Sequence, residues 1–381
     1  MSNKSCHAKV FYVSPMSYNN LAMYDYSLLS NIAHFKLEYF CNTKYDAQKL
    51  ALKMNMLYDY SDKSGVSKLI SYLKSQLKLL KIIQTEYPQI VHFQWFKIPY
   101  LDYYFLIKIR KSGAKIVLTA HNVLPHNTGD RYFRIYKKIY TIADRLIVHS
   151  EKTKEELVES FDVQKEKISV IPHGTLDFSS NIDLEKVAFY KNKFTKDFGL
   201  LGKTVFSALG VINDYKGIEL IVDAWKSETI SEKNDIHLII AGKGTHKKLV
   251  ELNERSNVSL ENRFLLDEEF LALLQVTDYV LLPYRKISQS GVLLTAMNEK
   301  KKVIVSNVGG LTDPFKFGKV GHVLEDLTTD AMKKSIHDAI ANSKKNPTDE
   351  VWEKVLDYFK WEGIARKTES LYSKLILSKS N

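Results

Sequence analysis

Short apolar runs, rich in Val, Ile and aromatic residues, alternate along the chain with longer segments that have the period of a helix. In the first half these runs are residues 9–14, 37–41, 90–94, 115–120, 145–149 and 168–172. In the second half they are residues 204–209, 237–241, 279–283 and 302–306. Such alternation is typical of βαβ units, which pair their strands in parallel and cover the sheet with helices. The sequence therefore predicts an α/β protein with two doubly wound parallel sheets.

The length of the chain also indicates two domains. With 381 residues, the chain exceeds what one ordinary hydrophobic core holds. Residues 177–203 separate the two sets of apolar runs and are polar and charged, so we expect a linker there, followed by the first helix of the second domain. The predicted domains are residues 1–176 and 177–358, with a C-terminal helix over residues 359–381.

Positive charge is concentrated in the first domain. Residues 1–150 contain 21 Lys and Arg against 9 Asp and Glu, a net charge of +12, whereas residues 151–381 contain 34 against 35, a net charge of −1. This asymmetry indicates an anionic partner for the first domain: phospholipid headgroups, a lipid-linked diphosphate or a nucleic acid. The aromatic residues form no RNA-binding motif, so we expect no nucleic-acid partner.

One basic amphipathic segment fits either a membrane surface or the face of a sheet. Residues 66–83 place leucine and isoleucine at helical spacing, with lysines between them. These lysines are Lys68, Lys74, Lys78 and Lys81. The segment can lie on an anionic bilayer, or it can be the crossover helix before the strand at residue 90, and both can hold together. A second basic helix is predicted over residues 132–140.

The composition favours a cytoplasmic protein. No run of about 18 apolar residues occurs in the sequence, and the segment before residue 9 is short and polar, without the features of a signal peptide. The two cysteines are too few for a disulfide framework or a zinc site. We therefore expect a reducing, cytoplasmic location, at the inner face of the cell membrane if the basic domain contacts lipid.

Lys216 is a candidate for binding phosphate. It follows the predicted strand 204–209 and a short loop, and with Gly217 it opens a helical run over residues 218–225. A lysine at a helix N-terminus suits a diphosphate, because its ammonium group neutralises charge and the free backbone amides point at the oxygens. Taken alone, the same pattern also fits a solvated surface lysine.

A second helix start of this kind follows the predicted strand 279–283. Residues 289–296 begin with Gln289 and Ser290, and Gly291 removes a side chain where a ligand can approach. Ser290 is a suitable cap that leaves neighbouring amides exposed, although simple helix capping is the alternative interpretation. Two phosphate-suited helix starts in one domain favour a nucleoside diphosphate as the ligand.

His121 is the candidate for chemistry in the first domain. It follows the predicted strand 115–120, and parallel sheets bind ligands at the carboxyl ends of their strands. An imidazole there can hydrogen-bond a sugar hydroxyl or carry a proton, and a structural histidine is the alternative. His121 and His126 have no acidic or cysteine partners clustered beside them, so we expect no metal site. His173 and Gly174 are interpreted as an ordinary turn.

Other enzyme classes lack their motifs in this sequence. Residues 241–244 (AGKG) resemble the start of a dinucleotide fingerprint but lack its third glycine. The sequence contains no GxxxxGK[ST] phosphate loop, no GxSxG nucleophile elbow and no CxxC pair. Kinases, hydrolases and redox enzymes are therefore disfavoured, and we expect no cofactor.

Several segments, taken in order, resemble glycosyltransferase family 4, the retaining enzymes of the GT-B fold, and in particular its bacterial polysaccharide-assembly members. They are residues 90–95 (IVHFQW), 118–126 (LTAHNVLPH), 147–150 (IVHS), 171–174 (IPHG), Gly210 with 215–217 (YKG), 282–284 (LPY), 289–293 (QSGVL), 361–362 (WE) and 371–372 (LY). The resemblance covers nearly the whole chain. It implies two Rossmann-like domains facing each other across a cleft, with the acceptor bound by the first, the nucleotide-sugar donor bound by the second, and the last helix crossing back to the first domain.

The resemblance also implies roles for individual residues. Lys216 matches the family lysine on the donor diphosphate, and His121 matches a histidine near the transferred sugar, so these two are the implied catalytic residues. The implied donor-binding residues are Gly210, Lys216, Gln289, Ser290, Gly291, Val292 and Thr295. The implied acceptor-binding residues are Ser17, Tyr18, Asn19 and Asn20, in a loop that is usually glycine-rich.

The sequence departs from the family pattern beside the donor. Many members carry two glutamates eight positions apart where this chain has Ile287 and Thr295, and Val211 stands where an arginine commonly binds phosphate. Lys216 and helix-terminal amides must then stabilise most of the diphosphate charge. Side chains other than the family glutamates must then recognise the donor sugar, and Gln289 is a candidate for this role.

We therefore expect a glycosyltransferase that moves a sugar from a UDP- or GDP-linked donor to a saccharide acceptor, lipid-linked, in cell-surface polysaccharide biosynthesis. The resemblance implies retention of configuration, with the leaving phosphate taking the acceptor's proton. Two alternatives stay open. One is a sugar-nucleotide epimerase of the GT-B type, and the other is a nucleotide-sugar-binding protein that has lost turnover.

Overall fold

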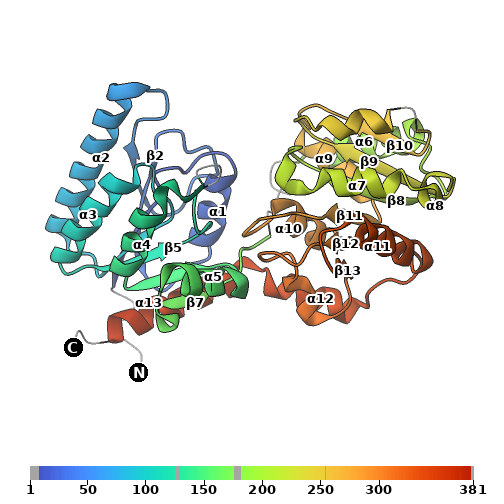
Figure 1. Cartoon of the computed structure of the whole chain (residues 1–381). Helices are drawn as coiled ribbons and strands as arrows, with labels where there is room; N and C mark the ends of the chain where they lie inside the picture. The colour runs from blue at the N-terminus through green and yellow to red at the C-terminus, as the bar shows by residue number, and fades with distance from the viewer. Residues whose placement is uncertain (1–7, 126–128, 176–181, 254, 379–381) are drawn as a thin grey trace. The chain divides into compact units, whose positions relative to one another are not determined.

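The computed structural model divides into two compact units (Figure 1). Unit 1 consists of Met1–Gly174 and Phe359–Asn381, and unit 2 consists of Thr175–Tyr358. The structure describes residues 8–125, 129–175, 182–253 and 255–378. The first part of the expected linker, residues 177–181, lies outside the described residues. Each unit contains one parallel sheet covered by helices, which confirms the predicted α/β class.

Unit 1 is built on a seven-stranded sheet in the order β3-β2-β1-β4-β5-β6-β7. The strands are β1 (Lys9–Val13), β2 (Lys36–Asn42), β3 (Lys53–Tyr58), β4 (Ile90–Phe93), β5 (Lys115–Thr119), β6 (Arg145–Val148) and β7 (Ile168–Val170). All neighbours pair in parallel, with Val10 opposite Leu37 of β2 and Ile90 of β4. Successive residues of a strand point to opposite faces, so strands buried on both faces read as continuous apolar runs.

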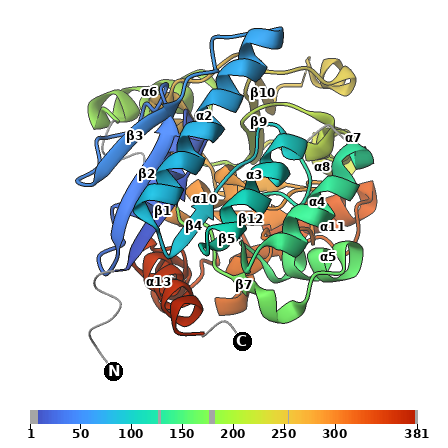
Figure 2. The same cartoon turned by 90° about the vertical axis from the view of Figure 1, so that its left-hand side faces the viewer.

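Helices cover both faces of this sheet. They are α1 (Asn20–Leu29), α2 (Gly65–Glu86), α3 (Pro99–Lys111), α4 (Phe133–Ile142), α5 (Glu151–Phe161) and the C-terminal α13 (Trp361–Leu377). Phe11 and Val13 of β1 pack in a core with α2 to α5, whereas Val10 and Tyr12 pack in a core with α1 and α13. Figure 2 shows α2, α3 and α4 beside one another across the sheet. The C-terminal helix therefore completes the core of unit 1.

Unit 2 is built on a six-stranded sheet in the order β10-β9-β8-β11-β12-β13. The strands are β8 (Thr204–Leu209), β9 (Ile236–Ala241), β10 (Val258–Glu261), β11 (Tyr279–Leu282), β12 (Lys302–Val305) and β13 (Gly321–Val323). The helices are α6 (Leu184–Asp197), α7 (Ile218–Trp225), α8 (Glu228–Ser231), α9 (Asp267–Val276), α10 (Gly291–Asn298), α11 (Thr329–Ala341) and α12 (Asp349–Tyr358). Side chains of α7, α8 and α11 share a core with β8, β9 and β11. This sheet is also doubly wound.

Three strands do not appear among the predicted runs: β3, β10 and β13. Each lies at an edge of its sheet. The sequence of β3 places Lys53 and Asn55 between apolar residues, and all four residues of β10 are half-buried. Edge strands are partly solvated and carry polar residues, so they lack the continuous apolar signal of central strands. The predicted central strands are present, and most end one or two residues earlier than expected.

Each sheet has a point where its strand order reverses. In unit 1 this switch point lies between β1 and β4, and in unit 2 it lies between β8 and β11. Loops from these strands diverge to opposite faces and leave a crevice at the carboxyl edge, where doubly wound proteins bind ligands. Ligand-binding residues are therefore expected in the loops that follow β1, β4 and β5 in unit 1, and β8 and β11 in unit 2.

Candidate active site

Lys216 and the start of α10 converge at the switch point of unit 2. Lys216 lies in the loop after β8, and Ser290 caps α10 after β11. A Cβ atom placed on Gly210 would lie 3.2 Å from Lys216 Nζ and 3.5 Å from Val292 Cγ2. The two loops are also joined directly, because the backbone amide of Arg285 donates to the carbonyl of Tyr215 at 2.7 Å. Two of the sequence-predicted phosphate features thus form one site.

The amine of Lys216 is held inside the protein. The residue is only 7% exposed, and its Nζ donates to the carbonyl oxygen of Leu209 at 3.1 Å. The same amine lies 5.5 Å from the centre of the Tyr284 ring. Burial lowers the pKa of Lys216 to about 8. A buried ammonium without a carboxylate partner loses hydration, so an arriving phosphate oxygen would relieve that cost.

The N-terminus of α10 presents backbone amides beside Lys216. The Ser290 hydroxyl accepts from the Leu293 amide at 3.3 Å, which satisfies one of the first-turn donors. Gly291 is exposed and Val292 half-buried, and the first amides of a helix have no carbonyl four residues before them within the helix. Together with the helix dipole they form an anion site. Thr295 is buried, and its hydroxyl donates to the Gly291 carbonyl at 2.9 Å, so it supports the helix start from within.

Gln289 lies under the loop that follows β12. A Cβ atom placed on Gly310 would lie 2.2 Å from Gln289 Nε2, so the glycine leaves room for this side chain. Val211, at the position of the family arginine, is 61% exposed. Ile287 replaces one of the family glutamates. Lys216 and the α10 amides therefore remain the candidate groups for binding a diphosphate at this switch point.

Two glycines allow backbone segments around Lys216 to pack in direct contact with each other. Gly242 has φ +144°, and a Cβ atom there would lie 2.2 Å from the Gly210 carbonyl oxygen. Gly217 has φ +67°, and its Cβ atom would lie 2.2 Å from the Pro283 carbonyl oxygen. Both contacts exclude a side chain. Gly242 of the AGKG segment therefore allows close packing against the Gly210 loop, beside Lys216.

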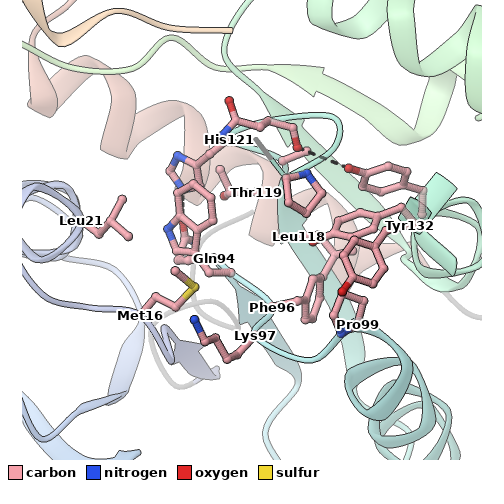
Figure 3. Close-up of a pocket in the computed structure, with 16 residues that line it drawn as sticks. Met16, Leu21, Gln94, Phe96, Lys97, Pro99, Leu118, Thr119, His121 and Tyr132 are labelled. Atoms are coloured by element: carbon pink, nitrogen blue, oxygen red, sulfur yellow. Dashed lines mark hydrogen bonds between the residues drawn. The ribbon is translucent and has the colours of Figure 1, made fainter. Parts of the chain in front are cut away.

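The switch point of unit 1 carries a pocket of about 380 Å³. Met16 follows β1, Gln94 to Lys97 follow β4, and Ala120 to Asn122 follow β5, so all come from the carboxyl edge of the sheet. Tyrosines of α4 and the turn before it close the opposite wall. Figure 3 shows His121 at one end of the pocket, with Tyr132 and Leu118 facing Met16 and Lys97. A volume of this size suits a small ligand or part of a larger one.

His121 is fixed in orientation by three neighbours. Its ring stacks on Trp95 with 4.5 Å between centroids and 7° between planes. Its Nε2 lies 2.9 Å from Gln94 Oε1, and its Nδ1 lies 3.2 Å from His149 Nε2. Burial, reinforced by His149 and other histidines, lowers the pKa of His121 well below its usual value. The imidazole is therefore neutral near pH 7 and held rigidly at the pocket.

His149 determines which nitrogen of His121 carries the proton. His149 Nδ1 lies 2.9 Å from the carbonyl oxygen of Ile171, which can only accept, so this nitrogen is the donor. Burial lowers the pKa of His149 to about 3, so the neutral ring accepts at Nε2 and His121 must donate through Nδ1. The Nε2 of His121 is then an acceptor, which the Gln94 amide satisfies if its oxygen and nitrogen are exchanged and His92 Nε2 donates to the Gln94 oxygen. Sequence inspection did not identify His149 as this partner.

His173 also belongs to this cluster. Its ring centre lies 5.3 Å from that of His149 and 4.8 Å from that of Tyr24 in α1. A Cβ atom on Gly174 would lie 2.3 Å from the Trp361 ring, so the glycine allows α13 to pack there. The interpretation of His173 and Gly174 as an ordinary turn missed both contacts. His126 lies outside the described residues.

The loop after β1 borders the pocket through Met16. Ser17 is fully buried, and its hydroxyl accepts from the Asn42 amide at 2.8 Å. Tyr18 is half-buried, and the exposed Asn19 caps α1 with φ 54° while its amide donates to Asp46. Asn20 is the first residue of α1. In this loop Ser17 fixes the backbone, whereas Tyr18 is half-buried and Asn19 is exposed.

No cluster of three or more His, Cys, Asp or Glu side chains suited to a metal ion occurs within the described ranges. His121 and His149 instead contact each other, and His149 also contacts the backbone carbonyl of Ile171.

The two units match two family models. Residues 64–175 match Glycosyltransferase Family 4, and residues 203–342 match Glycosyl transferases group 1. The Escherichia coli UDP-Gal:alpha-D-GlcNAc-diphosphoundecaprenol alpha-1,3-galactosyltransferase is 28% identical over 313 residues, which cover 74% of this chain and 78% of that protein. An uncharacterized glycosyltransferase of Methanocaldococcus jannaschii is 26% identical over 316 residues, which cover 80% and 81%.

Solved structures share the fold over nearly the full length. Sucrose-phosphate synthase from Thermosynechococcus elongatus has a TM-score of 0.71 at 18% identity, covering 98% of this chain and 100% of that one. Anabaena HepE, solved in complex with UDP, has a TM-score of 0.70 at 12% identity, covering 96% and 100%. The fold, the two family models and these relatives together show that the chain belongs to the GT-B glycosyltransferases of family 4 and group 1, as an enzyme of the hexosyltransferase type.

Proposed function

We propose that this enzyme transfers a hexose from a UDP-sugar to a saccharide carried on a lipid diphosphate, in the assembly of a cell-surface polysaccharide. The proposal that the donor is a nucleoside-diphosphate sugar rests on the buried Lys216 amine beside the α10 amides. Together these groups would bind a diphosphate with one cationic side chain. The choice of uridine is supported by HepE, which was solved with UDP and with UDP-glucose. The choice of acceptor is supported by the name of the E. coli relative.

The proposed reaction retains the anomeric configuration. An acceptor hydroxyl forms a bond to the anomeric carbon as the bond to the diphosphate oxygen breaks, and the acceptor's proton passes to the leaving phosphate. This route needs no carboxylate base, and no Asp or Glu is among the described residues that line the pocket beside His121. Lys216 and the α10 amides would stabilise the charge that develops on the diphosphate. A sugar hydroxyl would donate to Nε2 of the neutral His121 in place of the Gln94 amide, while Nδ1 stays bonded to His149.

We also propose that unit 1 rests on an anionic membrane at the cytoplasmic face. The α2 helix buries one face against the sheet, as a crossover helix does, yet it leaves several apolar side chains exposed on its outer face. These are Val66, Leu69, Ile70 and Leu77. Exposed Lys74, Lys78 and Lys81 accompany them, which is the composition of an interfacial helix. None of the helices in the described ranges has the length and hydrophobicity to span a bilayer.

Transfer to a lipid diphosphate saccharide tests this function. Purified enzyme is incubated with UDP-glucose, UDP-galactose or a UDP-N-acetylhexosamine and a polyprenyl-diphosphate-linked GlcNAc, and the lipid product is analysed by mass spectrometry. We expect one hexose to be added with release of UDP. Conversion of the UDP-sugar without acceptor would instead indicate an epimerase, and binding of UDP without any product would indicate a protein that has lost turnover.

A further inference from the structure

The pocket beside His121 combines an apolar, aromatic wall with one cation. Phe96, Pro99 and tyrosines of the α4 region form the wall. Lys97 is the one Lys or Arg among the described residues that line it, and Figure 3 shows its amine directed into the pocket beside Met16. A neutral saccharide alone would not require an ammonium group in an apolar wall. The combination suits a ligand with an anionic group joined to a hydrocarbon chain.

The amine of Lys97 has no carboxylate to neutralise it. In the part of the chain that the structure describes, no Asp or Glu oxygen lies within 4.0 Å of its Nζ. A second lysine lies on the same ring, since Lys97 and Lys68 both approach Tyr60, at 5.9 and 5.7 Å from the ring centre. Burial, reinforced by Lys68, lowers the pKa of Lys97. A lysine in the pocket wall with a second lysine nearby, and with no carboxylate paired to its amine among the described residues, favours binding of an anion from solution.

The backbone that carries Lys97 is held rigidly. Asp102 at the start of α3 is 1% exposed and accepts from the Ile98 amide at 2.9 Å. The same carboxylate accepts from Tyr72 and Gln76 of α2 at 2.6 and 2.8 Å. Asp102 therefore ties the loop after β4 to two helices. A preorganised loop loses little entropy when its lysine binds a ligand.

We propose that Lys97, assisted by Lys68, binds the phosphate of an amphiphilic acceptor whose first hydrocarbon units lie on the aromatic wall of the pocket. This inference rests on the proposed function, because it assigns a place to the lipid diphosphate of the acceptor. It also gives the net positive charge of residues 1–150 a function, because these residues belong to unit 1, where the acceptor is proposed to bind. The sequence offered Ser17 to Asn20 for the acceptor, and the amine of Lys97 lies beside Met16, the residue that precedes that loop.

Binding of a prenyl diphosphate tests the site without requiring turnover. Full-length enzyme is first saturated with UDP, so that the donor site is filled, and farnesyl diphosphate is then titrated by calorimetry. We expect saturable binding, and we expect Lys97→Ala to raise the Kd about tenfold or more, as loss of a charge-assisted hydrogen bond does. Lys97→Arg should keep most of the affinity, and binding of the neutral farnesol should not change in Lys97→Ala.

Two controls show whether binding needs both the Lys97 amine and the hydrocarbon. Lys111→Ala, which removes an exposed lysine at the end of α3, should leave the Kd for farnesyl diphosphate unchanged. Inorganic pyrophosphate should bind much more weakly than farnesyl diphosphate, because it lacks the hydrocarbon. An unchanged Kd in Lys97→Ala, or equal binding of pyrophosphate, overturns the proposal. A failed transfer assay with normal Lys97-dependent lipid binding would instead refute the proposed function.

Discussion

Replacing Lys216 by alanine is expected to lower the rate of sugar transfer by about 10² to 10³-fold, the usual cost of removing one group that stabilises a developing oxyanion. The expectation follows from the structure of the donor site, where Val211 replaces the family arginine and Lys216 is the buried cation beside the α10 amides. With few other charges to stabilise the diphosphate, the loss should fall on kcat as well as on UDP affinity.

The pH dependence of UDP binding gives the same prediction a second readout. Burial lowers the pKa of Lys216 to about 8 in the free enzyme, and a bound diphosphate would raise it again. Binding then takes up a proton above pH 8, so affinity falls as pH rises through the pKa of the free enzyme. For one group that binds only when charged, the Kd should rise about tenfold between pH 7 and pH 9. In Lys216→Ala this dependence should be absent.

A matched variant shows whether the effect belongs to the site. Lys196→Ala removes an exposed lysine of α6 in the same unit and should leave transfer and UDP affinity unchanged. Lys216→Ala should melt no earlier than wild type, because it removes the cost of a buried ammonium group. Transfer within a few-fold of wild type in a folded Lys216→Ala enzyme would show that the diphosphate binds elsewhere.

Replacing His121 by alanine is expected to reduce kcat/KM for transfer by about 10²-fold, while UDP affinity stays within about twofold of wild type. A positioned imidazole that bonds a reacting sugar typically contributes about that factor, and His121 lies in unit 1, whereas Lys216 belongs to unit 2. The measurement is steady-state transfer at several donor and acceptor concentrations, together with UDP titration of the same protein.

Loss of packing must be separated from loss of the imidazole. His121→Gln keeps a polar side chain against Gln94 and His149 and should recover part of the rate. His337→Ala, in α11 of unit 2, removes a histidine whose ring bonds Thr229 and should leave transfer unchanged. If His121→Ala melts like wild type and retains full transfer, the histidine cluster is structural only.

The sequence predicted the central strands and the position of Lys216 well, because both depend on local patterns. Continuous apolar runs mark strands buried on both faces, and residues 204–209 and 218–225 coincide with β8 and α7. The edge strand β3 carries Lys53 and Asn55, so its pattern resembles a loop. Local periodicity therefore located the strands buried on both faces and the edge strand β7, and it missed the other three edge strands.

The pocket of unit 1 was harder to predict, since its residues meet only through the sheet. Gln94, His121 and His149 come from loops after three different strands, and successive members are 27 and 28 positions apart in sequence. A histidine directly after a strand indicates a possible ligand site, but the neighbouring sequence does not show which side chains from other loops contact it. Lys97 was overlooked because a single lysine after a strand has no distinctive pattern. Knowing the strand order would have placed these loops side by side.

The departures from the family pattern were visible in the sequence, and the structure shows how they are accommodated. Thr295, at a family glutamate position, turns its hydroxyl to the Gly291 carbonyl. Gln289 fits under Gly310, where a Cβ atom would collide with it. Both side chains are thus packed at the start of α10.

Thermal unfolding of the wild-type enzyme with UDP, GDP and ADP tests the central claim most directly, that unit 2 holds a nucleoside diphosphate at Lys216 and α10. A ligand at about 100 times its Kd stabilises the folded state by roughly 2.7 kcal/mol. We expect UDP to raise the melting temperature of wild type, GDP and ADP to raise it less, and none of the three to raise that of Lys216→Ala. No shift with any nucleotide, or an equal shift in Lys216→Ala, would contradict the assigned donor site.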